Sequence, residues 1–427
     1  AIKHHERVWG DSSPLTAAQY RALDALCARA GIELVPNMNS LGHFDRWLRY
    51  EEYQPLAESK APFVDPLGNT RPYPTTLCPD GRAVDFIASL YDDFLPNFTS
   101  KNFNVGCDEP WELGMGKSAE ACKQKGKYKV YIDYLKKLEN LCAVRGKTMH
   151  FWADVLLENP EYSKELSPGT VAVLWGYYPD SPIDEEAKTL QELGRKFIIA
   201  GGTNTWNSFA LRLNAAYQNV KDVCSAAKNR GALGAILTNW GDNGNHQAWC
   251  AMWLPVIAFA QSAWGETFDE ADVCRAADSF VFRDATSNMS KAVTLLGRAD
   301  PSVKLHSLHN KLFFGKPAEV EALKAEGVSK KHFDQIYNGA EAAIEAVKKA
   351  DPHCPDAEVC KGELLLAADL MKWSVARACD DVNVESARLR KGLKIMKGQY
   401  EQLWLARARI GGLFESSARA FLNRSPK

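Results

Sequence analysis

The chain has 427 residues, of which 25% are charged and 46% are hydrophobic. This ordinary globular composition excludes a collagen-like, low-complexity or wholly disordered chain, and the length predicts two or three domains. Lysine and arginine number 52 against 53 acidic residues, so the net charge of −1 predicts no nucleic-acid partner. No apolar run approaches the roughly 18 residues of a membrane-spanning helix, and we expect no membrane partner.

Between residues 14 and 265, short apolar segments alternate with segments of helical periodicity. The apolar segments predict parallel strands that end in polar, glycine or tryptophan residues: 32–40, 102–109, 148–155, 171–177, 196–202 and 234–242. Helices are expected around them at 15–30, 81–95, 127–145, 184–194, 212–230 and 250–263. Strands that are apolar on both faces, with polar residues at their C-terminal ends, favour an α/β fold of the (β/α)8 TIM-barrel type. A nucleotide-binding sheet has no support, because no GxGxxG motif follows a strand.

From residue 266 onward the composition changes to long stretches rich in alanine, leucine, lysine and glutamate. These stretches predict helices at 317–326, 330–350, 356–379 and 383–422. Strand-like alternation is absent there. We therefore expect a barrel over residues 1–265, followed by an all-α domain over residues 266–427 that packs on it.

The cysteines argue against a disulfide framework, because their number, 11, is odd and they are scattered through a long chain. Only Cys354 and Cys360, which flank a loop, are spaced to pair. Neither CxxC nor zinc-ligand spacing occurs, and His353 beside Cys354 is more typical of a loop than of a metal ligand. We expect no metal and no cofactor. The cysteine usage favours a reducing compartment such as the cytoplasm.

Two adjacent carboxylates, Asp108 and Glu109, end the predicted strand 102–109. A pair of carboxylates at the mouth of a barrel is typical of a glycosidase, in which one protonates the leaving oxygen and the other stabilises positive charge. Taken alone, the pair is equally compatible with a structural or metal-binding role.

Aromatic residues with polar neighbours follow the other predicted strands. His43 follows strand 32–40, and the later strands are followed in turn by Trp152 and Asp154, Trp175 and Tyr177, Trp206 and Asn207, and Trp240 and Asp242. Any single tryptophan at such a place is more typical of a core. Sugars need aromatic faces for their C–H patches and carboxylates or amides for their hydroxyls. The set as a whole therefore predicts a sugar-binding cleft.

From about Trp9 to Trp264 the sequence resembles the family 20 glycoside hydrolases, the β-N-acetylhexosaminidases. The most specific match is to the family's His/Asn-x-Gly-x-Asp-Glu signature, at Asn104 to Glu109. The resemblance implies a catalytic TIM barrel over residues 1–265, in which the strand carrying the signature is strand four.

The resemblance also implies an activity: an exo-acting β-N-acetylhexosaminidase that releases terminal β-linked GlcNAc or GalNAc from a glycan or glycoconjugate. Glu109 would be the general acid/base. Asp108 would orient the 2-acetamido group of the substrate, whose oxygen attacks the anomeric carbon to give an oxazolinium intermediate. The product would retain its anomeric configuration.

Substrate-binding residues follow from the same resemblance. It implies an aromatic pocket around the acetamido group, formed by Trp152, Trp175 and Trp240. It places His43 near the acid/base and Asp242 on the sugar hydroxyls. The tyrosine that the family carries near strand seven has no match here, and we expect Tyr177 or Trp206 in its place.

The family's strand one, with its substrate-binding arginine, and most of its strand two have no counterpart in this sequence. We therefore expect the chain to be a fragment or to be completed by another segment, which leaves any export signal open. Two other functions stay open: a non-catalytic carbohydrate-binding protein on the same scaffold, and a retaining glycosidase for sugars without an acetamido group. The oligomeric state and the choice between GlcNAc and GalNAc are open as well.

Overall fold

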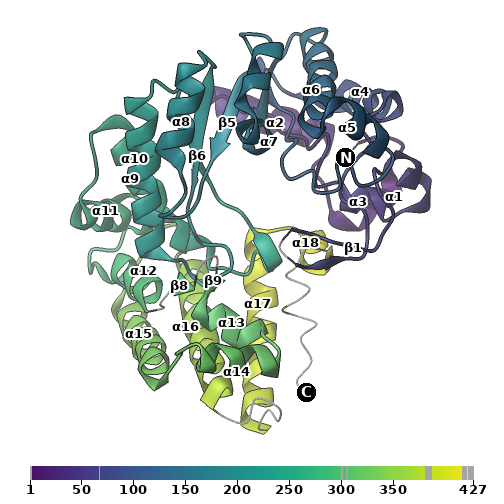
Figure 1. Cartoon of the computed structure of the whole chain (residues 1–427). Helices are drawn as coiled ribbons and strands as arrows, with labels where there is room; N and C mark the ends of the chain where they lie inside the picture. Colours follow the sequence, from purple (N-terminus) through teal and green to yellow (C-terminus); the bar gives the residue numbers. More distant parts are fainter. Residues whose placement is uncertain are drawn as a thin grey trace.

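The computed structural model describes residues 2–66, 68–299, 302–303, 306–379, 387–415 and 421. At its centre lies a parallel sheet of five strands in the order β3-β4-β5-β6-β7, curled like part of a barrel wall (Figure 1). The strands are β3 (Asn102–Asn104), β4 (Thr148–Trp152), β5 (Val171–Trp175), β6 (Phe197–Gly202) and β7 (Ala235–Thr238). This alternation of strands and helices confirms the TIM-type fold predicted from the sequence.

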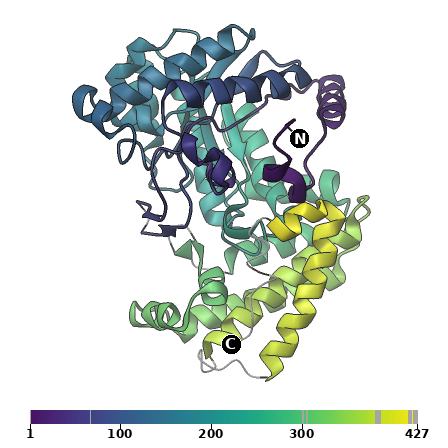
Figure 2. The same ribbon diagram turned by 90° about the vertical axis from the view of Figure 1, so that its right-hand side faces the viewer.

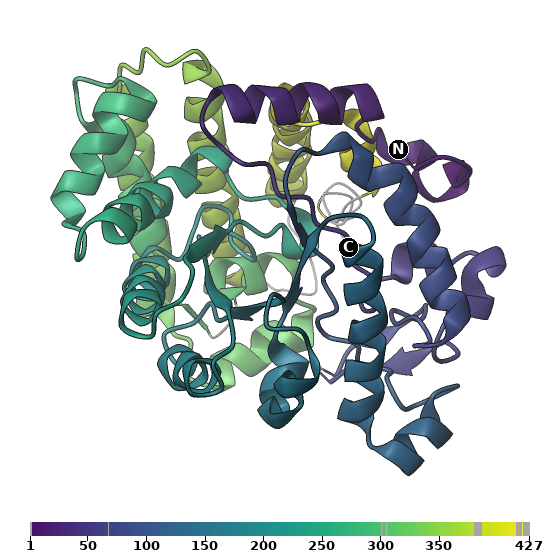
Figure 3. The same cartoon turned by 90° about the horizontal axis from the view of Figure 1, so that it is seen from above.

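Helices connect neighbouring strands and lie around the outer side of the sheet, as seen from above in Figure 3. Those next to the sheet are α4 (Gly81–Phe94), α5 (Ala119–Lys125), α6 (Lys127–Ala143), α7 (Asp154–Glu158), α8 (Ile183–Glu192), α9 (Leu213–Asn229) and α10 (Trp253–Trp264). The N-terminal part adds α1 (Glu6–Trp9), α2 (Ala17–Arg29), α3 (Asp45–Leu48) and a hairpin of β1 (Phe63–Val64) and β2 (Thr70–Arg71).

The segment predicted as a strand at 32–40 forms only an isolated parallel bridge, between Asn37 and Asn104. Pro36 has no N–H to donate, and the chain bends at residues 40–42. Pairing is therefore confined to two bonds of 3.0 Å, from Asn104 N–H to the Pro36 carbonyl and from Met38 N–H to the Asn104 carbonyl. The prediction of a regular strand here is wrong, and in the described residues this segment is an irregular edge of a five-stranded wall.

The C-terminal region is helical, as predicted, and lies below the sheet (Figure 2). Its helices are α11 (Glu270–Ala276), α12 (Asn288–Arg298), α13 (Leu308–Phe314), α14 (Pro317–Ala325), α15 (Lys330–Lys349), α16 (Ala357–Cys379), α17 (Ala387–Arg407) and α18 (Ile410–Glu415). A π-helical turn (Ala277–Phe282) and the two-residue strands β8 (Ser302–Val303) and β9 (His306–Ser307) complete it. The single helix predicted at 383–422 is wrong at residues 408 and 409, where the chain breaks between α17 and α18; residues 383–386, 416–420 and 422 lie outside the described residues.

Two large hydrophobic cores hold these parts together. One fills the half of the barrel built from β3 to β6 and its helices. The other is continuous from barrel residues such as Phe209 and Leu254 to Phe313 and Trp373 of the helical region. Because this second core contains residues from both sides of residue 265, the helical region and the barrel pack against each other in one core. The predicted boundary between two domains at residue 265 stays a prediction.

The last described helix returns to the start of the chain. Arg409, just before α18, donates hydrogen bonds to the carbonyls of Ser13 (3.1 Å) and Pro14 (2.8 Å). All eleven cysteines are free thiols, including Cys354 and Cys360. Among the described residues, no helix combines the length and apolarity needed to cross a membrane.

Candidate active site

The two adjacent carboxylates follow β3 on a strongly bent backbone. The strand ends at Asn104, earlier than predicted, because Gly106 (φ 70°), Cys107 (φ 73°) and Glu109 (φ 45°) adopt left-handed conformations. Non-glycine residues rarely do so, and such strain is concentrated at functional sites. Gly42 packs against this bend so closely that a Cβ there would lie 2.2 Å from the Asp108 carbonyl oxygen.

His43 bridges the two carboxylates. Its Nε2 lies 3.1 Å from Asp108 Oδ2 and 3.6 Å from Glu109 Oε2. Burial lowers the pKa of His43, but its hydrogen bond to Asp108 and the charges of Asp108 and Glu109 outweigh burial and raise it to about 9. His43 is therefore an imidazolium at neutral pH, and the site holds one cation between two acids.

Asp154 supports the acid pair from the next strand. Its Oδ2 accepts a hydrogen bond from the backbone N–H of Glu109 at 3.0 Å. Burial, with the charge of Asp108, raises the pKa of Asp154 to about 7. Burial also raises the pKa of Glu109; His43 opposes this and Asp108 adds to it. In the described residues, Oδ1 of Asp108 and Oδ1 of Asp154 are buried without a hydrogen-bond partner.

The aromatic residues predicted at the strand ends pack in two sets that adjoin, because Trp175 lies against the buried cluster that contains Trp152. The Trp152 and Trp240 rings lie 6.1 Å apart, Tyr177 stacks on Trp175 at 5.3 Å, and Trp206 meets Tyr177 edge-on at 5.4 Å. Burial raises the pKa of the Tyr177 phenol, and the charges of Asp108 and Asp242 raise it further, which places the phenol near both carboxylates. The ends of β4, β5, β6 and β7 thus meet beside the acid pair.

The members of this group differ in exposure. Trp240 is 39% exposed and Trp152 only 7%, whereas Trp206 is 1% exposed and lies behind Tyr177. Gly202 makes room for Trp206, because a Cβ there would lie 2.3 Å from its ring. Trp206 thus supports the aromatic wall from behind.

Asn207 and Asp242 lie on neighbouring loops. Asn207 is buried, and its Oδ1 accepts a hydrogen bond from Asn243 Nδ2 at 2.9 Å, which ties the loop after β6 to the loop after β7. Asp242 is exposed overall, but burial of its carboxyl group raises the pKa of that group. The charges of His43 and Arg212 lower the pKa and only partly offset this effect. Asp242 therefore lies within electrostatic reach of His43, while Asn207 is engaged by protein.

The sequence profile of the glycosyl hydrolase family 20 catalytic domain matches residues 3–275. The chain belongs to glycosyl hydrolase family 20. It is therefore a glycoside hydrolase, as the Asn104–Glu109 signature predicted.

Solved structures of similar proteins include one that shares the fold. A chitobiase from Flavobacterium johnsoniae is 16% identical, with a TM-score of 0.53 over 95% of this chain and 71% of that chain. A β-N-acetylhexosaminidase from Bacteroides fragilis is 17% identical, with a TM-score of 0.49 over 62% of this chain and 55% of that chain. At such identities the likeness to the chitobiase shows the fold alone. No curated protein sequence gave a significant match.

Two loops of this family 20 hydrolase, 57–79 and 110–118, are braced by buried carboxylates that the sequence did not reveal. Glu112 accepts hydrogen bonds from Thr75 N–H (3.1 Å) and from the Thr75, Thr76 and Ser59 hydroxyls. Glu58 accepts in return from the N–H groups of Gly116 (3.1 Å) and Ser118 (3.0 Å). Each loop thus supplies the carboxylate that fixes the other, directly beyond Glu109.

Two arginines near the site were also missed. Arg212 is buried, donates to Asn204 Oδ1 at 3.0 Å and places its guanidinium 5.5 Å from the Trp206 ring centroid. Arg71 of β2 lies 4.9 Å above the Trp111 ring, and its charge lowers the pKa of Glu109. Neither arginine stands beside a motif in the sequence, so only the tertiary structure identifies them.

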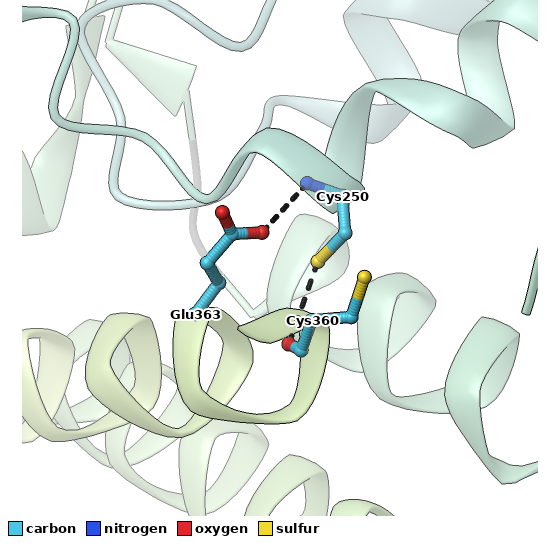
Figure 4. A group of neighbouring side chains, drawn as sticks. All are labelled: Cys250, Cys360 and Glu363. Atoms are coloured by element: carbon cyan, nitrogen blue, oxygen red, sulfur yellow. Dashed lines mark hydrogen bonds between the residues drawn. The ribbon is translucent and has the colours of Figure 1, made fainter. Parts of the chain in front are cut away.

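One cluster elsewhere in the hydrolase has the donors of a metal site. Cys250, Cys360 and Glu363 place their ligand atoms within 4.8 Å of one another, where the turn before α10 meets α16 (Figure 4). A second group, formed by Cys354, Asp356 and Cys360, shares a cysteine with it. The guanidinium of Arg407 already bonds to Glu363, Asp356 and Cys360. These acids therefore have a protein cation as their partner.

Proposed function

We propose that this family 20 hydrolase is an exo-acting β-N-acetylhexosaminidase that removes terminal β-linked GlcNAc or GalNAc with retention, by substrate-assisted catalysis. The observation that carries the proposal is the arrangement of Asp108, Glu109 and His43 beside an aromatic wall. Two adjacent acids serve different roles when their environments differ, and here only Asp108 is hydrogen-bonded to the imidazolium.

Glu109 is the general acid/base. Burial and the charge of Asp108 raise its pKa, so it retains a proton closer to neutral pH and donates it to the leaving oxygen. After departure of the leaving group, the same carboxylate accepts a proton from the water that opens the intermediate.

Asp108 handles the acetamido group. Its Oδ2 is held by His43, while its buried Oδ1 has no partner in the described part of the chain. An acceptor in that position suits the acetamido N–H of a substrate, because a buried carboxylate oxygen gains most from a donor. As the acetamido oxygen attacks the anomeric carbon, the negative charge of Asp108 stabilises the developing oxazolinium.

The aromatic wall excludes water from this step. Trp152, Trp175 and Trp240 present ring faces and edges to the sugar and its acetamido methyl group. The Tyr177 hydroxyl takes the place of the tyrosine that the family carries near strand seven and donates to the acetamido carbonyl. Asp242 accepts hydrogen bonds from sugar hydroxyls.

The test compares an aryl N-acetyl-β-glucosaminide with the matching aryl β-glucoside. We expect hydrolysis of the first only, and loss of hydrolysis in Glu109→Ala. That variant should recover most of kcat/KM on a dinitrophenyl glycoside, whose leaving group needs no proton, while its kcat stays low because the base that activates water is missing. Binding of N-acetylglucosamine without turnover of either substrate would favour the carbohydrate-binding alternative. Hydrolysis of the glucoside, with a fluorosugar trapped as an ester, would favour a glycosidase that does not use an acetamide.

A further inference from the structure

In the two loops beyond Glu109, 57–79 and 110–118, the acidic side chains are buried and the basic side chains face solvent. Their acids are buried and hydrogen-bonded: Glu58, Asp65 and Glu112 are 1%, 3% and 0% exposed. The charged side chains that face solvent in the described residues of these loops are all cations: Lys60, Arg71 and Lys117. The solvent-facing charges of these two loops are therefore positive, although the acid site itself is rich in carboxylates.

Arg71 is the member of this set that is fixed in position. Its Nε donates to the buried carboxylate of Asp65 at 2.7 Å, and its guanidinium lies 4.9 Å from the Trp111 ring centroid. The side chain remains 38% exposed. An arginine that is held by a carboxylate on one side and by an aromatic face below has little conformational freedom left to lose when a ligand binds. Its planar guanidinium offers donors to an anion.

Trp111 connects this arginine to the acid site. Its backbone N–H donates to the Glu109 carbonyl at 2.8 Å, and its ring lies edge-on to the His43 ring at 6.3 Å. The aromatic wall of Trp152, Trp175 and Trp240 comes from other strands, whereas Trp111 lies directly after the acid/base. We define Arg71 and Trp111 as the Arg71–Trp111 shelf.

We propose that the Arg71–Trp111 shelf binds the leaving sugar, and that the preferred substrates carry a negative charge on that sugar. This inference rests on the proposed function. If Glu109 is the general acid, it faces the leaving oxygen, and the residues just beyond Glu109 face the leaving group. Arg71 covers one face of the Trp111 ring, so Trp111 offers the sugar its remaining apolar ring surface. Arg71 pairs with a carboxylate or a sulfate ester on the sugar. A terminal N-acetylhexosamine linked to a uronic acid, or to a sulfated sugar, has this chemistry.

The experiment measures kcat/KM for three substrates with the same terminal N-acetylglucosamine and different leaving sugars. The leaving sugar is neutral in the first, a uronic acid in the second and a sulfated sugar in the third. We expect the wild type to prefer at least one acidic substrate over the neutral one by roughly tenfold, the size of a partly exposed charge-assisted hydrogen bond. The preferred acid identifies the source of the charge.

Variants at Arg71 show whether the shelf causes that preference. Arg71→Gln should bring the ratio of kcat/KM for the acidic substrate to kcat/KM for the neutral substrate close to one. Arg71→Lys should retain part of the preference, because the charge remains without the planar guanidinium. Arg82→Gln is the matched control, since Arg82 is also a surface arginine paired with an aspartate, Asp80, and should leave the ratio unchanged. Melting midpoints of all three variants check folding.

Two results would overturn the inference. One is equal kcat/KM for the acidic and neutral substrates in the wild type. The other is an acidic preference that survives Arg71→Gln in a folded protein. If none of the three substrates, nor the aryl N-acetylglucosaminide, is hydrolysed, then the proposed function itself has failed. Cleavage of all of them at equal rates contradicts only the shelf.

Discussion

The carboxylate of Asp154 accepts a hydrogen bond from the backbone N–H of Glu109 at 3.0 Å, so the first residue of α7, just after β4, fixes the main chain of the acid that follows β3. Glu109 needs such support because its φ of 45° is one that non-glycine residues rarely adopt. The sequence predicted Asp154 as a sugar contact, which stays a prediction; in the structure its Oδ2 is bonded to the Glu109 backbone. We expect Asp154 to be a positioning residue for Glu109.

Removing this support should lower turnover. Asp154→Ala deletes the acceptor, lets Glu109 leave its position and should reduce kcat by roughly ten- to a hundredfold, with little change in KM. Asp154→Asn keeps an amide oxygen that accepts the same N–H, so its loss should be much smaller. Steady-state kinetics on an aryl N-acetylglucosaminide measure both. An alanine variant with wild-type kcat would show that Asp154 does not position the acid.

The His43 cation should contribute to stability in a pH-dependent way. Its pKa of about 9 in the folded protein lies above the ordinary histidine value of 6.5, because the acid pair outweighs burial. A pKa raised on folding stabilises the protein fully below the unfolded value, and this stabilisation is lost as the pH rises through the folded value. The melting midpoint of the wild type should therefore exceed that of His43→Gln by more at about pH 6 than at about pH 10. A difference that does not change with pH would mean that His43 is not charged in the folded site.

Trp240 and Trp206 should separate binding from stability. Trp240 is 39% exposed, so Trp240→Ala should raise KM by roughly tenfold through loss of a ring contact, with little change in the melting midpoint. Trp206 is 1% exposed, and Trp206→Ala should cost about 3–5 kcal/mol of unfolding free energy by leaving a cavity. Kinetics and thermal unfolding of the two variants provide the comparison. The reverse pattern would place Trp206, and not Trp240, against the sugar.

Much of the fold and the family could be predicted from local patterns. The Asn104–Glu109 segment carries the signature within six consecutive residues, and Trp152, Trp175 and Trp240 each end an apolar strand, where polar neighbours mark them out. Most of the predicted helices match the structure to within a few residues because their apolar periodicity is long, whereas the predicted helix 383–422 breaks at residues 408 and 409. Segment 32–40 failed because its apolar residues resemble a strand, while Pro36 and the following bend limit its pairing to one bridge.

The parts that were missed depend on distant contacts. Arg71 becomes a candidate only because a hairpin places it over Trp111, and Arg212 only because α9 begins beside Trp206. In the sequence, Glu58 and Glu112 look like ordinary loop carboxylates. Their hydrogen bonds, each to the other loop, are seen only in the tertiary structure. Asn207 was predicted from its tryptophan neighbour, but its bond to Asn243 depends on the loop after β7.

The most direct test of the central claim is the response of Asp108→Asn to a thiazoline analogue of the bicyclic oxazolinium intermediate. The substitution keeps the size and shape of the side chain but removes the negative charge that stabilises the developing cation. This loss should cost on the order of 3 kcal/mol of transition-state stabilisation, or about a hundredfold in kcat, with KM little changed. If Asp108 binds the acetamido group, the thiazoline should inhibit the wild type strongly and Asp108→Asn weakly. Equal inhibition of both proteins would contradict substrate-assisted catalysis through Asp108.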